Sequence, residues 1–266
     1  MVSNIKELDA SFWVKTRNSL ASQQTILFWT GSIYALIPNE PKHHLFKMAG
    51  MSVSRSLANG DKGWDFTSRE LTYYLDPKTD RVLRHWENPW TKEIVPVVHV
   101  ANSPVQGRFH GRFPALIERD LTTFMFDLFT HYPNPLAGDK RFIDYSPIKT
   151  YQATELFKFT VPTQELLDPQ TTEVSQVILS WDRIGPWLPW MKMGTKPGQL
   201  VYSAHGSKVN DFGELPQWLQ EELDYRLPSY KKAPTTKLNQ ENMTSWRYFK
   251  RHFDAYLAGE HFPLSA

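Results

Sequence analysis

The sequence predicts a mainly β protein: an antiparallel, lipocalin-like barrel of the calycin type, or a strongly curved sheet, with N- and C-terminal helices. Short apolar runs rich in β-branched and aromatic residues recur along the chain, as is typical of strands. Turn-rich segments separate these runs, and no long helices alternate with them, which argues against a parallel α/β fold. No repeat or linker divides the 266 residues, so we expect one domain over 1–266.

The barrel is expected between two helical regions. Residues 4–22 predict an N-terminal helix, because Asn4 is suited to cap it, Glu7 follows three residues later, and apolar residues recur at helical spacing. The barrel should then occupy residues 25–208, and C-terminal helices should occupy 213–258. Within the last region the apolar periodicity favours helices over 215–223 and 241–258.

Alternating or continuous apolar runs mark the expected strands. The Asp76-Pro77 turn predicts a hairpin over 68–88, and residues 93–101 add a third strand to make a meander. Residues 105–131 fit either strands or a helix opened by Pro114, and their threonines and phenylalanines favour strands. The other expected strands are 25–37, 45–57, 151–161, 173–183 and 199–208.

Residues 181–206 are unusually aromatic. They hold three of the ten tryptophans and two of the seven methionines within a short span: Trp181, Trp187, Trp190, Met191 and Met193. The prolines and glycines between them exclude a regular helix or a central strand. We therefore expect a rigid loop at one end of the barrel, which either packs as a plug against the core or closes as a lid over a ligand.

Composition narrows the class of function. A net charge of +2 with 14% aromatic residues argues for an aromatic interior and against a nucleic-acid partner. The chain has no cysteine, so disulfides and thiolate chemistry are excluded. Neither a secretory signal nor a membrane span is recognisable, and we expect a soluble, cytoplasmic protein with no transmembrane segment. A homodimer is compatible with the sequence.

Strand parity selects the candidate catalytic residues. Glu155 shares its strand face with Tyr151, Phe157 and Phe159, and burial there would raise its pKa toward the range useful to a general acid or base. The alternative is that Glu155 pairs with an inward arginine, Arg55 or Arg183. The remaining candidates for an acid/base group are His99, His85, His205 and Tyr73, with Glu70 and Tyr74 beside them.

A ligand is expected to contact the aromatic and sulfur side chains. The candidate ligand-binding residues are Trp187, Trp190, Met191, Met193, Tyr74, Trp86, Phe157 and Phe159. No dinucleotide, P-loop, zincin or nucleophile-elbow motif is present, and we expect neither a cofactor nor a metal. A three-histidine metal site is the less favoured alternative, drawn from His85, His99, His110 and His205.

Several motif blocks resemble the domain-of-unknown-function family 1838. They are FWTGSIYALIP, LFKMAGMSVSRS, ELTYYLDPKTDRVLRHWENPWTKEIVPVVHVANSPV, YPNPL, WLPWMKMGTKPGQLVYSAHG and TSWRYFK. The resemblance implies that residues 25–250 form one unit, and it carries no reaction with it. Members often start with a twin-arginine export signal, an expectation that does not extend to this sequence because it has no Arg-Arg leader.

Two functions therefore remain as hypotheses. The first is a cofactor-free enzyme, an isomerase, cyclase or hydratase/lyase, that acts on a hydrophobic isoprenoid, pigment or oxylipin by acid/base chemistry. The second is a binding or carrier protein for a lipid, pigment or haem-like ligand, with His99 or His205 as an axial ligand. A third, less favoured, uses the Trp187–Met193 segment as a protein or membrane contact.

Overall fold

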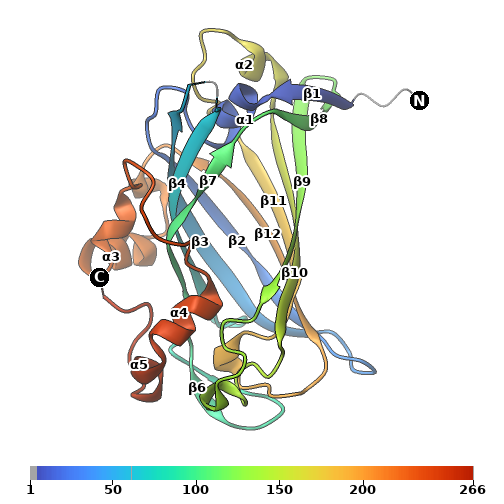
Figure 1. Cartoon of the computed structure of the whole chain (residues 1–266), viewed down its shortest axis with the longest axis vertical. Helices are drawn as coiled ribbons and strands as arrows, with labels where there is room; N and C mark the ends of the chain where they lie inside the picture. The colour runs from blue at the N-terminus through green and yellow to red at the C-terminus, as the bar shows by residue number, and fades with distance from the viewer. Residues whose placement is uncertain (1–4, 61, 266) are drawn as a thin grey trace.

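An antiparallel sheet of ten strands curls strongly into a half-barrel (Figure 1). The computed structural model describes residues 5–60 and 62–265. The strand order in the sheet is β1-β8-β9-β10-β11-β12-β2-β3-β4-β7, so β1 and β7 are its edges. The predicted mainly β, antiparallel and strongly curved architecture is confirmed.

The described elements have the following bounds. The strands are β1 (Ile5–Asp9), β2 (Thr25–Leu36), β3 (His43–Ala58), β4 (Trp64–Leu75), β5 (His85–Glu87), β6 (Ile94–Pro96), β7 (Val100–Phe109), β8 (Arg112–Glu118), β9 (Leu121–Pro133), β10 (Thr150–Pro162), β11 (Ile178–Gly185) and β12 (Gln199–Val209). The α-helices are α1 (Ala10–Arg17), α2 (Thr163–Leu167), α3 (Gln217–Tyr225), α4 (Ser245–Arg251) and α5 (Phe253–Leu257). Short 3-10 turns are η1 (Lys140–Phe142), η2 (Pro189–Met191), η3 (Phe212–Glu214) and η4 (Pro228–Lys231).

Side-chain alternation along β10 shows how the sequence makes an interior. Tyr151 and Phe159 are buried, whereas Gln152 and Lys158 between them are exposed. Successive side chains of a strand point to opposite faces, so the odd-numbered residues of β10 face inward. Glu155 belongs to that inward set, as its parity predicts.

The sheet register brings residues from separate strands together on the inner face. Glu155 on β10 lies opposite Arg183 on β11, and Arg183 lies opposite Tyr202 on β12. Phe157 lies opposite Trp181 in the next inward row. Directly opposed side chains in a ladder are close enough to interact, so β10, β11 and β12 build one continuous polar and aromatic wall.

The N-terminal helix is shorter than predicted. Asn4, the expected cap, lies outside the described residues, and β1 pairs with β8 where helix was expected. Helix α1 begins after Asp9, whose carboxylate accepts a hydrogen bond from the Ser11 amide at 2.9 Å. Asp is a favoured N-cap, which explains why the helix starts there and leaves the preceding residues to complete the sheet edge.

The predicted meander over residues 68–101 is wrong for its first pair of strands and correct in part for its second, where residues 85–87 pair with 94–96. The Asp76 carboxylate does organise a turn by accepting from the backbone amides of Lys78 and Thr79. After the turn only the bridge between Leu75 and Val82 continues toward β4, and β4 pairs with β3 and β7. Strands β5 and β6 form a separate two-stranded sheet. Local turn chemistry thus specified the reversal but not the partner strand.

The ambiguous residues 105–131 are strands, as favoured. Strand β7 leads through a short turn into β8, and β8 pairs with β9. At the C-terminal end, the single helix expected over 241–258 is two short helices, α4 and α5. Helix α4 begins only after Thr244, whose hydroxyl accepts from the Arg247 amide at 3.3 Å. Asn242, two residues before Thr244, instead contacts β7, where its side chain forms hydrogen bonds with the backbone of Gln106.

Aromatic clusters close both ends of the half-barrel. Trp13 of α1 lies within 4.9 to 5.9 Å, between ring centroids, of five inward phenylalanines: Phe109, Phe113, Phe124, Phe126 and Phe159. At the other end, the segment containing η2 packs beneath the sheet (Figure 1). Helix α3 covers the outer face of β4 through Trp218 and Tyr73, whose ring centroids are 5.2 Å apart. None of the described helices is long and apolar enough to cross a membrane.

Candidate functional site

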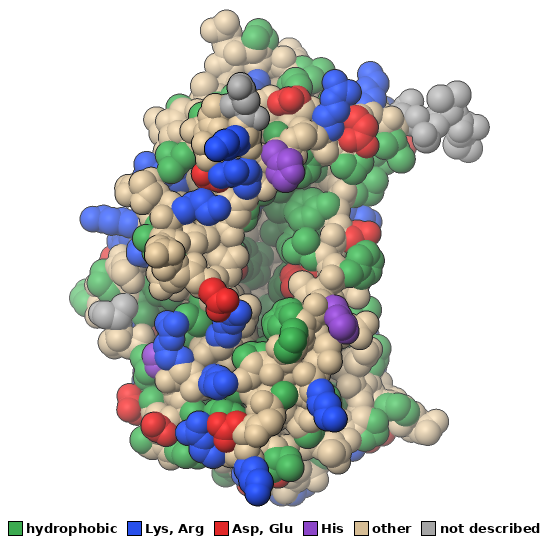
Figure 2. Space-filling model, in the orientation of Figure 1, with side chains coloured by type: hydrophobic (Ala, Val, Ile, Leu, Met, Phe, Trp, Pro, Cys, Tyr) green, Lys and Arg blue, Asp and Glu red, His purple; other side chains and the backbone are tan. Residues whose placement is uncertain are grey.

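A cavity of about 460 Å³ lies inside the half-barrel. Figure 2 shows a hollow in the middle of the face on which Figure 1 places β7 to one side and β9 to the other. Nine aromatic side chains line it: Trp29, Tyr74, Tyr132, Tyr151, Phe157, Phe159, Trp181, Tyr202 and Trp246. We call this cavity the lumen. Its size and apolar walls are those of a site for a small organic molecule.

Glu155 projects into the lumen, where its carboxylate has two protein partners. The Trp181 indole Nε1 donates to one carboxylate oxygen at 3.0 Å, and Arg183 Nε lies 3.8 Å from the other. The side chain is 23% exposed, so the carboxylate is accessible from the cavity. The predicted alternative, a pairing of Glu155 with Arg183, is therefore what the structure shows, and it occurs within the lumen.

Arg183 is held between two tyrosines. Its Nη2 donates to the Tyr151 hydroxyl at 2.7 Å, and its guanidinium lies 4.8 Å from the centre of the Tyr202 ring. Burial alone would lower the pKa of Arg183, but Tyr151, Tyr202 and Glu155 together raise it above its ordinary value. The guanidinium therefore remains charged inside the cavity. The same burial raises the pKa of Tyr202 to about 12.

A second carboxyl group, Glu70, reaches the lumen from β4. Burial raises its pKa, the nearby Arg17 guanidinium opposes this, and the charge of Glu155 raises it further. Arg17 comes from the end of α1 and donates to the hydroxyls of Ser54 at 2.8 Å and Ser52 at 3.1 Å. Burial lowers the pKa of Arg17 to about 10, and Glu70 offsets part of that shift. The lumen thus contains two carboxyl groups and two guanidinium groups.

Gly50 leaves the space that the Trp29 side chain occupies in the lumen wall. Trp29 of β2 lies against Gly50 of the neighbouring β3, where a Cβ atom would be only 2.5 Å from the indole Nε1. Any side chain at that position would displace the indole or the strand. Glycine is therefore required at position 50 for Trp29 to line the cavity in this orientation.

The predicted ligand-binding residues divide between the lumen and its base. Tyr74, Phe157 and Phe159 line the lumen, together with the catalytic candidate Glu155. The other five are packed at the end of the half-barrel and are not among the lining residues: Trp86, Trp187, Trp190, Met191 and Met193.

The base is a plug that supports the lumen. The Trp190 ring contacts those of Phe46, Tyr74 and Trp86 at centroid distances of 5.8, 5.6 and 5.9 Å. The segment's tryptophans are 8% (Trp187) and 2% (Trp190) exposed, so they do not offer an apolar contact surface. The 187–193 segment reaches the cavity through Leu188. Of the two roles expected for this segment, a plug packed against the core or a lid over a ligand, the structure shows the packed plug.

The structure does not bring the remaining catalytic candidates together. His99 is buried behind β4, where its Nδ1 accepts from the Tyr74 amide at 3.1 Å, and burial lowers its pKa to about 3. Tyr73 also faces outward and donates to Glu222 of α3 at 3.0 Å. His85 is exposed on β5, and His205 is exposed on the outer face of β12. No group of three or more His, Cys, Asp or Glu residues in the described part of the chain is placed to hold a metal ion.

Three lumen residues, Tyr151, Trp181 and Arg17, were not among the candidate site residues chosen from the sequence. Tyr151 and Trp181 have the inward parity of their strands, and that signal could have identified both as lining residues. Arg17 gave no such signal, because it is the last residue of a helix whose docking on the end of the barrel depends on tertiary contacts. Long-range placement, more than local pattern, decides which charges enter the cavity.

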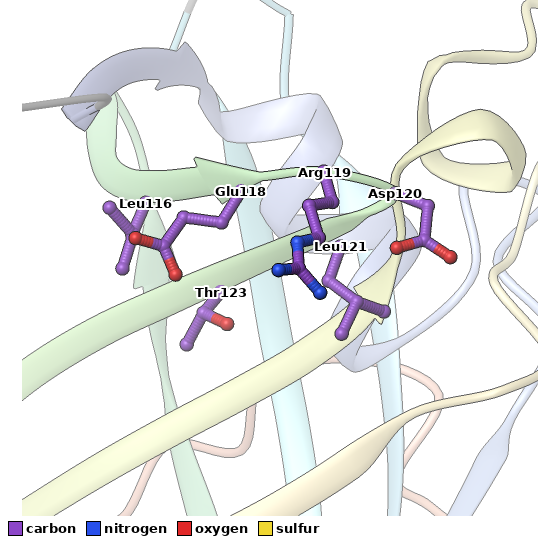
Figure 3. A pocket seen from close by; sticks show the side chains of 6 residues that line it. All are labelled: Leu116, Glu118, Arg119, Asp120, Leu121 and Thr123. Atoms are coloured by element: carbon purple, nitrogen blue, oxygen red, sulfur yellow. The ribbon is translucent and has the colours of Figure 1, made fainter.

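A second hollow, of about 590 Å³, lies at the turn between β8 and β9 (Figure 3). Its six lining residues are Leu116, Glu118, Arg119, Asp120, Leu121 and Thr123. All are half-buried or exposed, and the charged ones are fully at the surface. This hollow lacks the buried polar groups that distinguish the lumen, so we place the candidate site in the lumen.

The sequence profile of a family described as "Protein of unknown function (DUF1838)" matches residues 22–253. The chain belongs to the DUF1838 family. The matched region includes β2 to β12, α3 and α4, and hence most of the lumen wall. Arg17 lies outside it, so one of the four lumen charges comes from the N-terminal segment that precedes the DUF1838 match. A search of curated proteins gives no match to the chain.

Proposed function

We propose that the protein is an enzyme that acts on a hydrophobic small molecule in the lumen by acid/base chemistry. The observation that carries the proposal is the presence of two carboxyl groups, Glu155 and Glu70, in one aromatic cavity. Their surroundings differ, because Glu155 is paired with Arg183 and Trp181 whereas burial raises the pKa of Glu70. Two carboxyl groups in different surroundings are the usual basis for a general base and a general acid.

The roles follow from that difference. Glu155, with its charge balanced by Arg183, is the candidate base that removes a proton from the substrate. Glu70, which burial favours in its protonated form, is the candidate acid that donates one. An isomerisation by this route breaks one C–H bond and forms another, with no net proton gained or lost. Cyclisation and hydration or dehydration need the same pair, and the aromatic walls limit access of bulk water.

Incorporation of deuterium from D2O into the products tests this proposal, and the test does not require the substrate to be identified first. The protein is incubated in D2O with an organic-solvent extract of the cells that produce it, and the products are analysed by mass spectrometry. Wild type should generate deuterium-labelled products, and Glu155→Gln and Glu70→Gln should each reduce the labelling rate at least about a hundredfold. His205→Ala, a change on the exposed outer face, is the matched control and should retain the wild-type rate. Full labelling by both carboxyl variants would refute the assignment.

A second candidate function is a carrier that binds the same class of ligand without turnover. One observation favours it: Glu155 already has two protein partners, as expected of a structural carboxylate. Neither His99 nor His205 lines the lumen, so neither supports the haem-type binding considered from the sequence. Recovery of one unchanged hydrophobic molecule from purified protein, with no deuterium labelling, would favour the carrier over the enzyme.

A further inference from the structure

Arg183 is fixed in the lumen by contacts on three sides. Tyr151 accepts a hydrogen bond from Nη2 at 2.7 Å, and the Tyr202 ring lies 4.8 Å from the guanidinium carbon. The third side is Gly185, where a Cβ atom would lie 2.8 Å from Nη2 and 3.0 Å from the guanidinium carbon. The absence of a side chain at Gly185 therefore lets the guanidinium fold back along β11. Arg183 is pre-organised before any ligand arrives.

Part of the hydrogen-bonding capacity of Arg183 is unused by the protein. A guanidinium has five N–H donors. Among the described residues Nη1 has no hydrogen-bond partner, and Nε lies 3.8 Å from Glu155, beyond hydrogen-bond distance. Arg183 is 7% exposed, so these donors are withdrawn from bulk solvent. A buried donor without a partner is costly, and an acceptor that reaches the guanidinium from the lumen would use hydrogen-bonding capacity that the protein leaves free.

The other lumen cation does not offer the same opportunity. Both terminal nitrogens of Arg17 already donate to the hydroxyls of Ser52 and Ser54. Arg17 also lies near Glu70, which offsets its charge. Burial favours the neutral form of Glu70. The other charged groups of the lumen, Arg17, Arg183 and Glu155, then give it a net positive charge. An anion is therefore better accommodated than a cation, and Arg183 is the side chain with donors free to receive it.

We propose that Arg183 is the anion-binding residue of the lumen and that the ligand is a hydrophobic carboxylic acid, bound as its carboxylate. The planar guanidinium matches a carboxylate, whose two oxygens can accept from the N–H donors that Arg183 does not use within the protein. The apolar body of the ligand lies along Phe157 and Trp181, in the row of inward side chains next to Arg183. This inference names the substrate class of the proposed function and rests on it.

A matched pair of competitors tests the inference. The neutral fluorophore N-phenyl-1-naphthylamine is bound to the wild-type protein and displaced at pH 7.5 with decanoate or with decan-1-ol, which differ in the charged group. Wild type should bind decanoate at least about tenfold more tightly than decan-1-ol, which corresponds to one charge-assisted hydrogen bond. Arg183→Met should abolish this preference but still bind the fluorophore. Ile184→Ala, on the exposed face of the same strand, should keep it.

A second variant covers the case in which Arg183→Met fails to fold because Glu155 is left without its partner. Gly185→Ala removes no charge, yet it pushes the guanidinium out of its position. It should reduce the preference for decanoate while leaving binding of decan-1-ol within about twofold of wild type. Equal displacement by decanoate and decan-1-ol in wild type would overturn this inference alone. Failure of the fluorophore to bind at all would overturn the lumen function on which it rests.

Discussion

The change of stability with pH tests whether His99 is a buried structural residue. The side chain is 1% exposed, its Nδ1 accepts the Tyr74 amide, and burial lowers its pKa to about 3. In the unfolded chain the pKa returns to about 6.5. Between these values the unfolded chain binds one more proton than the folded protein, so the stabilisation is complete above pH 6.5 and is lost as the pH falls toward 3. The loss amounts to about 2 kcal/mol between pH 7 and pH 5.

Urea unfolding followed by tryptophan fluorescence at pH 7, 6 and 5 measures this loss. His99→Asn keeps an acceptor for the Tyr74 amide but cannot titrate, so its free energy of unfolding should fall by about 2 kcal/mol less than that of wild type over this range. His205→Asn, on the exposed outer face, should keep the full wild-type decline. Equal declines in wild type and His99→Asn would refute the structural role assigned to His99.

Two further changes probe the ends and the interior of the half-barrel. Trp13→Ala removes the ring that contacts five phenylalanines and should lower the free energy of unfolding by about 3 to 5 kcal/mol, measured by urea unfolding. A loss under about 1 kcal/mol would contradict the role of Trp13 in the aromatic cluster that closes its end of the half-barrel. Glu70 should change the stability with pH in the opposite direction to His99. Its raised pKa means that the folded protein binds one more proton than the unfolded chain, so stability is lost as the pH rises above about 4.5. That part of the pH dependence should be absent from Glu70→Gln, and an unchanged profile would show that Glu70 ionises as it does in the unfolded chain.

The sequence predicted the inner surface of individual strands well. Period-two alternation placed Glu155 with Phe157 and Phe159, and the register confirms that all three face the lumen. This works because the side a residue faces is a local property of a strand. The same reasoning correctly favoured strands over a helix in 105–131, where β-branched and aromatic residues dominate.

The local sequence did not predict which strands pair or which charged side chains from distant elements enter the lumen. The Asp76 turn was predicted, but residues 81–88 leave the sheet and β7 takes their place beside β4. Arg17 enters the lumen only because α1 docks on the end of the half-barrel. The aromatic segment 187–193 was correctly expected at one end, yet composition alone did not distinguish a buried plug from a lid. Each outcome depends on contacts between residues that are distant in sequence.

If the lumen receives a hydrophobic ligand whose charged end contacts Arg183, a bound fatty acid should show this contact. A crystal structure of the protein grown with saturating decanoate tests it most directly. We expect density for the alkyl chain against Phe157 and Trp181, with a carboxylate oxygen within about 3 Å of a guanidinium nitrogen of Arg183. Density for decanoate at the β8–β9 turn or elsewhere on the surface, with none in the lumen, would contradict it.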